Sequence, residues 1–64
     1  MTRPNMTRPK FFELTGLTGG AILGVAARSL RQAMKLFRED GHAGAFVVYE
    51  YGNDGKVKKL SIQL

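Results

Sequence analysis

Catalytic chemistry needs acids, histidines or thiols within reach of one another, and this sequence supplies few of them. Its 64 residues include five Asp and Glu residues, one histidine and no cysteine. The carboxylates are scattered along the chain, so no two are placed to share a catalytic proton, and His42 alone does not make a metal site. No Ser-His-Asp or Cys-His set is present either. We therefore predict a protein that is not an enzyme, with no catalytic residue, metal, cofactor or small-molecule substrate.

Cations are the side chains that this sequence supplies in excess. Ten Lys and Arg residues give a net charge of +5 and an isoelectric point near 10.1. A row of cations along one side of a helix can track a phosphate backbone, because each neutralised phosphate releases condensed counterions. The alternative is that these cations form a solvated face that keeps the protein soluble. Gln32 is the only amide beside the row, so we expect little base readout. On a helix, the candidate nucleic-acid contacts fall within roughly 80° of one another: Arg28, Arg31, Lys35 and Arg38.

A second candidate surface lies in the C-terminal third of the chain. Tyr49 and Tyr51 alternate along a predicted strand, and Lys56, Lys58 and Lys59 follow the next turn. Aromatic residues interleaved with cations can stack bases and hold phosphates. The same residues can instead pack across strands or against a second protomer. The sequence therefore leaves nucleic acid and protein open as partners of this surface.

The element expected to position the basic row is a helix over residues 20–39, with Gly41 placed to end it. Its apolar side chains would cover roughly 200° of the circumference, whereas a surface helix needs a stripe a little over about 100° wide. We therefore expect a second molecule to cover this arc, as a homodimer or as another protein partner. The predicted interface residues, with those of the tyrosine surface, are Leu23, Leu30, Met34, Phe37, Tyr49 and Tyr51.

A β-hairpin is predicted over residues 43–64, because two runs with strand-like composition flank a Gly-Asn-Asp-Gly-Lys turn signal. A two-residue turn at Asp54 and Gly55 would pair Glu50 with Lys59. A three-residue loop with Gly55 in the left-handed bulge position would pair Glu50 with Lys58. We prefer the second register because it places five apolar side chains on the face that the helix can cover: Phe46, Val48, Leu60, Ile62 and Leu64.

These elements predict an α+β fold in which one long helix packs on the C-terminal hairpin. Residues 10–14 form either a short strand or a lead-in to the helix, and the strand alternative gives the order β-α-β-β. A glycine- and threonine-rich loop separates this segment from the helix. Residues 1–9 repeat Met-Thr-Arg-Pro and are expected to be a flexible basic arm. The predicted organisation is thus this arm followed by a single small domain over residues 10–64.

Residues 7–27 run Thr-Arg-Pro-Lys-Phe and continue into an apolar stretch rich in glycine and alanine. This segment resembles a twin-arginine export signal, with Pro9 in place of the second arginine. The resemblance implies export, or association with a membrane. However, removing residues 1–27 would leave too little core to fold, and the apolar stretch has about 14 residues where a membrane span needs about 20. We therefore expect an uncleaved cytoplasmic protein without a membrane partner.

Three hypotheses about function follow from these patterns. The first is a self-associating basic module that binds nucleic acid without sequence preference. The second is a protein-interaction module, such as an inhibitor, an accessory subunit or a phage or plasmid regulator, that uses the apolar arc and the tyrosine surface. The third is an export-signal or membrane-associated small protein.

Overall fold

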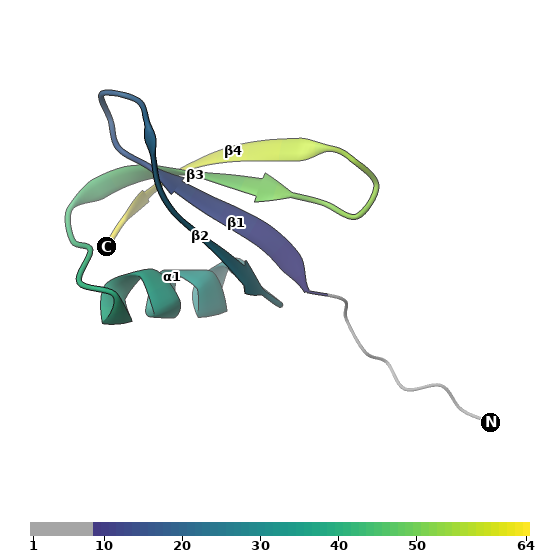
Figure 1. Ribbon diagram of the computed structural model, residues 1–64, viewed down its shortest axis with the longest axis horizontal. Helices are drawn as coiled ribbons and strands as arrows, with labels where there is room; N and C mark the ends of the chain where they lie inside the picture. Colours follow the sequence, from purple (N-terminus) through teal and green to yellow (C-terminus); the bar gives the residue numbers. More distant parts are fainter. Residues whose placement is uncertain (1–8) are drawn as a thin grey trace.

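Two β-hairpins joined by a helix build one antiparallel sheet (Figure 1). The computed structural model describes residues 9–64, so residues 1–8 of the expected basic arm lie outside the described part. The sheet order is β2-β1-β3-β4, and the helix lies on one face of the sheet (Figure 1). The elements in chain order are β1 (Lys10–Thr15), β2 (Ala21–Ala27), α1 (Leu30–Glu39), β3 (Ala45–Tyr51) and β4 (Val57–Gln63). The α+β class and the C-terminal hairpin are therefore confirmed.

The prediction of a helix over residues 20–39 is wrong in its N-terminal half, because residues 21–27 form strand β2. Gly19 and Gly20 have positive φ values of 97° and 90°, and this left-handed backbone reverses the chain into a hairpin. β2 then pairs with β1 along its whole length. Gly24 lowers the helical propensity of this segment and β-branched Ile22 and Val25 favour a strand. The observed order is thus β-β-α-β-β rather than β-α-β-β.

The helix begins where a capping signal stands in the sequence. The Ser29 hydroxyl accepts a hydrogen bond from the Gln32 backbone N–H at 3.2 Å. The Gln32 side-chain oxygen in turn accepts the backbone N–H of Arg28 at 2.8 Å. Ser-x-x-Gln is a typical start of a helix, and the sequence-based prediction overlooked it. At the other end Gly41, with φ of 94°, ends the helix as expected.

The hairpin register is the preferred one. Glu50 lies opposite Lys58, Val48 opposite Leu60 and Phe46 opposite Ile62. Gly55 has a φ of 84°, the left-handed backbone that the three-residue loop requires. The Gly52 N–H closes the loop by donating to the Lys56 carbonyl at 2.8 Å.

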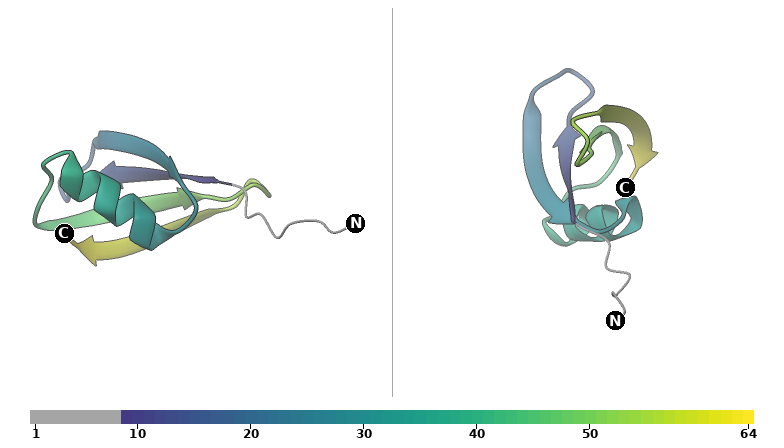
Figure 2. Two further views of the ribbon diagram at one scale, coloured as in Figure 1. Left: turned by 90° about the horizontal axis from the view of Figure 1, so that it is seen from below. Right: turned by 90° about the vertical axis from the view of Figure 1, so that its right-hand side faces the viewer.

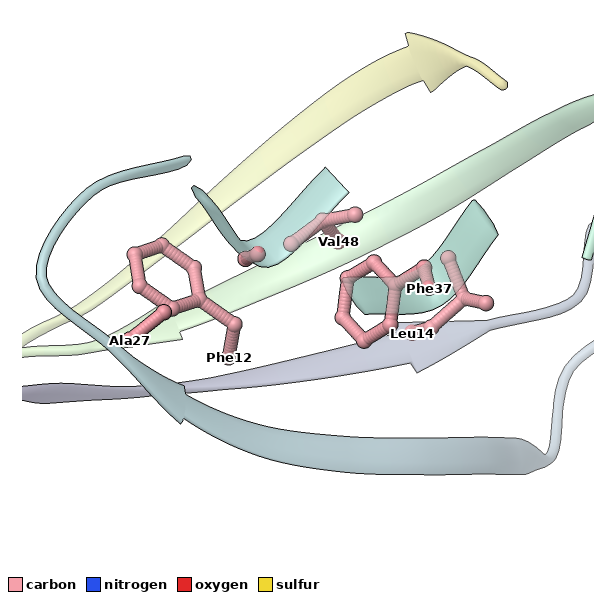
Figure 3. Packing of buried hydrophobic residues seen from close by; sticks show 6 residues of the cluster. Phe12, Leu14, Ala27, Phe37 and Val48 are labelled. Carbon is pink, nitrogen blue, oxygen red and sulfur yellow. The ribbon is translucent and has the colours of Figure 1, made fainter. Parts of the chain in front are cut away.

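The core lies between α1 and one face of the sheet, where β2, β1 and β3 each contribute a buried side chain (Figure 3). Phe37 is completely buried there, so its prediction as an interface residue is wrong. The wide apolar arc was a property of a helix that does not form; the real helix buries a stripe of ordinary width around Ala33 and Phe37. The buried residues in the described part are Phe12, Leu14, Ala27, Ala33, Phe37 and Val48.

Truncation of Phe37 tests its place in the core. We expect Phe37→Ala to lower the free energy of unfolding by about 3–5 kcal/mol, because it removes a fully buried ring. That loss equals about the whole stability of a domain this small, so urea titration followed by circular dichroism should find the variant largely unfolded. Leu17→Ala, in an exposed loop, is the control and should leave the midpoint unchanged. A well-folded Phe37→Ala protein that only fails to self-associate would restore the interface interpretation.

Candidate binding surfaces

Three cations occupy the solvent side of α1: Arg31, Lys35 and Arg38, which we call the α1 cationic face. They are exposed, fall within an arc of about 60°, and extend over about 10 Å along the helix axis. Their direction is set by the core, since Ala33 and Phe37 are buried on the opposite side. The α1 cationic face is therefore a short, open row of positive charge.

Few carboxylates neutralise positive charge in this protein. Within residues 9–64 the ion pair is Lys10–Glu50, and His42 makes a hydrogen-bonded contact with Asp40; neither involves the α1 cationic face. Arg28, predicted to belong to the same row, precedes the helix cap and lies outside α1. It is exposed next to the N-terminal end of the helix. The structure thus keeps three of the four predicted helix cations in one row.

The hairpin lysines do not extend this row. Lys58 lies opposite Glu50 and Lys59 opposite Tyr49 in the β3–β4 register, so the two lysines point to opposite faces of the sheet. Lys56 stands after the turn, which projects away from α1 (Figure 1). The seven cations predicted as one nucleic-acid site are therefore divided between the helix and the far end of the hairpin.

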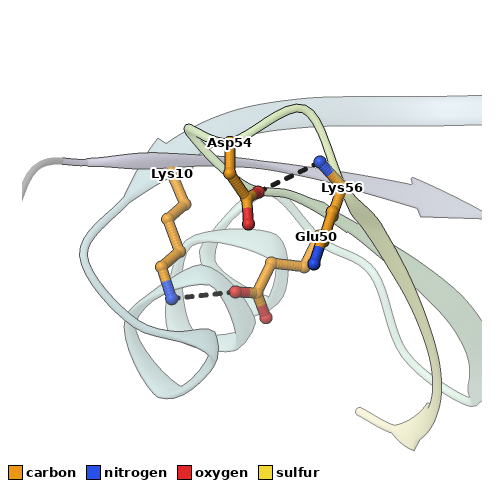
Figure 4. A network of polar contacts seen from close by, with 4 residues as sticks. All are labelled: Lys10, Glu50, Asp54 and Lys56. Atoms are coloured by element: carbon orange, nitrogen blue, oxygen red, sulfur yellow. Dashed lines mark hydrogen bonds and ion pairs between the residues drawn. The ribbon is translucent and has the colours of Figure 1, made fainter.

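A shallow pocket of about 490 Å³ lies beside the β3–β4 turn. The Lys10 ammonium is 2.9 Å from a carboxylate oxygen of Glu50, which ties β1 to β3 (Figure 4). Asp54 accepts the backbone N–H of Lys56 at 3.0 Å and holds the turn. Because Lys10 is partly exposed, its ion pair is worth about 1 kcal/mol or less. The pocket is lined by Lys10, Glu50, Gly52, Asn53, Asp54, Lys56, Val57 and Lys58.

The outer face of the sheet, which faces away from α1, exposes large apolar side chains. Phe11, Tyr51 and Val57 lie in one cross-strand row and are 47%, 36% and 52% exposed. The rings of Phe11 and Tyr51 are 5.7 Å apart and tilted by 53°, a favourable aromatic geometry. Ile22, 45% exposed, extends the same surface at the β2 edge. Within the described part of the chain, no helix covers this face (Figure 2).

A carboxylate stands among the aromatic residues of the outer face. The Tyr51 hydroxyl donates a hydrogen bond to Glu13 at 2.6 Å, and Glu13 lies opposite Tyr49 in the β1–β3 register. This hydrogen bond, together with desolvation and the negative charge of Glu13, raises the pKa of Tyr51 above 10.0. Glu13 offsets the positive charge of Lys59, which lies in the same cross-strand row, so the outer face suits an apolar partner better than a nucleic-acid backbone.

The remaining predicted interface residues take different positions. Leu23 and Leu30 are half-buried and pack against the core of their own chain. Met34 and Tyr49 are also half-buried, whereas Tyr51 is exposed. The six residues predicted as one interface are thus distributed over the two faces of the sheet and the helix.

Other site types are not found in the part of the chain that the structure describes. There, no group of three or more His, Asp or Glu side chains is placed to hold a metal ion. Within residues 9–64 there is also no helix long and apolar enough to cross a membrane. Most of the segment that resembles an export signal forms β1 and β2, whose Phe12, Leu14 and Ala27 belong to the core.

The contact between Tyr51 and Glu13 predicts a titration effect. The chain has two tyrosines, so a Tyr49→Phe background isolates Tyr51 and its phenolate absorbance. We expect Glu13→Gln in this background to lower the pKa of Tyr51 towards 10.0, because the negative acceptor that favours the protonated phenol is gone. With Glu13 present, the contribution of this contact to the free energy of unfolding should be complete below pH 10.0, where the unfolded-state phenol is protonated. It should be lost as the pH rises through the raised folded-state pKa of Tyr51. Identical titration curves for the two proteins would contradict the contact.

Comparison of the chain with protein-family models, with curated proteins and with solved structures gave no match. The argument about function therefore rests on the charge, exposure and geometry of the residues described above. Among them, the α1 cationic face is an exposed row of charge and the outer face carries exposed large apolar side chains.

Proposed function

We propose that this protein is a small basic binding module that contacts the phosphate backbone of nucleic acid through the α1 cationic face. The observation that supports this most directly is the row of Arg31, Lys35 and Arg38, exposed on one side of α1 and outside the ion pairs of residues 9–64. Cations held on a helix face and outside close ion pairs gain free energy from phosphates by releasing counterions. The two arginines also present planar groups that bind phosphate oxygens bidentately.

The contacts would be with phosphates rather than with bases. Gln32 is the amide closest to the row in sequence, and its side-chain oxygen already accepts the Arg28 backbone N–H. Bidentate recognition of adenine needs a free Asn or Gln amide. Arg28 lies at the N-terminal end of α1, where the helix dipole also favours anions. The proposed binding therefore lacks amide readout of adenine and rests on phosphate contacts, with a salt slope of about 3 for the three cations of the row.

A charge-matched pair of variants tests the site. The triple variant Arg31→Gln, Lys35→Gln and Arg38→Gln should weaken binding to a labelled duplex about tenfold or more and flatten its salt dependence. Fluorescence anisotropy at several salt concentrations measures both effects.

The control is the triple variant Lys56→Gln, Lys58→Gln and Lys59→Gln, which removes the same charge from the hairpin. It should lose much less affinity than the helix triple variant. Equal losses would show that net charge acts without a site on α1. Failure of the unmodified protein to bind a duplex at low salt would refute the proposal.

A second candidate function is a protein-interaction module that uses the outer face. Its support is the row of Phe11, Tyr51 and Val57, since soluble monomers rarely expose contiguous apolar side chains. Under this alternative the charge of α1 only aids solubility, and the helix triple variant would be harmless. The anisotropy experiment therefore separates the two functions.

A further inference from the structure

We infer that the free edge of β2 pairs with β2 of a second copy of this chain, in antiparallel orientation, to form one continuous eight-stranded sheet. The sheet has two edge strands, β2 and β4. β4 carries Lys58 and Lys59, and lysines are a common protection of an edge strand. β2, Ala-Ile-Leu-Gly-Val-Ala-Ala, is seven residues long and has neither a charge nor a proline. Figure 2 shows β2 at an open margin of the sheet.

The sequence of β2 is complementary to itself about its central residue. With Gly24 opposite Gly24 of the second copy, Ile22 lies opposite Ala26, and Leu23 lies opposite Val25. Each pair joins a larger side chain with a smaller one. Leu23 and Val25 pack towards the core, and Ile22 and Ala26 occupy the alternate positions, so both faces of the sheet continue across the junction.

Phe11 supports the same arrangement. Its ring lies directly over Gly24, because a Cβ atom there would come within 2.3 Å of the ring. Pairing at Gly24 would therefore bring the two Phe11 rings side by side on the outer face, with the strands about 5 Å apart. Phe11 and Ile22, both largely exposed in the single chain, would become covered together.

The charges on the edge strands themselves favour a second copy at β2 rather than at β4, although the cations of the two α1 helices, which pack on β2, oppose the association. Two chains of charge +5 repel each other, but the β2 ladder contains no charge. The nearest flanking cation, Arg28, would lie opposite Gly20 of the second copy, with the two arginines about 27 Å apart along the strands. That separation exceeds the screening length of about 8 Å at physiological ionic strength. Pairing of β4 with itself would instead bring four lysines together.

Size favours the association but limits its strength. Six side chains of the described residues are buried in the apolar core, and a domain this small gains from burying more surface. A ladder of seven residues is nevertheless shorter than the usual interface, which buries about 1,600 Å². The dimer is thus reversible and depends on protein concentration.

Cysteine pairing tests the register, and the absence of native cysteine gives a clean background. Ile22→Cys and Ala26→Cys proteins, mixed and mildly oxidised, should form a mixed disulfide dimer, because these positions lie opposite each other. Each protein alone should crosslink at least tenfold more slowly. Two copies of position 22 would be about 13 Å apart along the strands, beyond the reach of a disulfide. Non-reducing gels and mass spectrometry measure the products.

The matched control for crosslinking is a mixture of Val57→Cys and Ser61→Cys, two positions on β4 with the same spacing and on the same outer face of the sheet. It should give no more mixed dimer than either protein alone. Equal crosslinking of the β2 and β4 pairs would mean random collision and would overturn the inference.

The oligomeric state gives a second measurement. Sedimentation equilibrium at physiological salt, without nucleic acid, should show a monomer–dimer equilibrium for the unmodified chain. Ile22→Lys with Ala26→Lys should raise the dissociation constant at least tenfold, whereas Val57→Lys with Ser61→Lys adds the same charge to β4 and should not. Circular dichroism checks that all variants fold. A monomer at every concentration, or loss of the dimer only in the β4 variant, would overturn the inference without affecting the proposed function.

Discussion

Burial of β1 beneath α1 is the interaction on which the rest of this structure depends. β1 pairs with both β2 and β3, and its Phe12 and Leu14 are two of the largest fully buried side chains. Phe37 of α1 completes the cluster from the helix side (Figure 3). Because the described residues form one ten-residue helix, it covers one face of the sheet only. The outer face of the sheet is exposed for this reason, and the helix leaves the two edge strands open as well.

The part of the fold that sequence reasoning predicted correctly is the part specified by local chemistry. The β3–β4 hairpin follows from alternating residues around a Gly-Asn-Asp-Gly turn, and Gly55 selects the register. The C-terminal half of the expected helix is confirmed for the same reason. The prediction for residues 21–27 failed because their apolar pattern fits a helix face and an edge strand paired with β1 equally well. Pairing with β1, a tertiary interaction, decided between them, while the Ser29–Gln32 cap marked the true helix start.

The candidate surfaces divide in the same way between features that local sequence predicts and features that depend on the pairing of distant strands. Arg31, Lys35 and Arg38 share a face because they lie on the correctly predicted half of the helix. The contact between Tyr51 and Glu13 joins residues 38 positions apart, and the Lys10–Glu50 ion pair also joins distant segments. Both require the pairing of β1 with β3. No spacing in the sequence predicts that pairing, so the pocket and the acidic residue beside the row of Phe11, Tyr51 and Val57 were missed.

The proposed dimer and the proposed nucleic-acid surface bear on each other through symmetry. Antiparallel pairing about a two-fold axis perpendicular to the sheet leaves both copies of α1 on the same side of the continuous sheet. Six helix cations would then face one polyanion, and the salt slope would rise from about 3 to about 6. Bringing the two basic helices to one side costs free energy until phosphates neutralise them. Nucleic acid that binds both helices would therefore stabilise the dimer, and dimerisation would strengthen phosphate binding by the same factor.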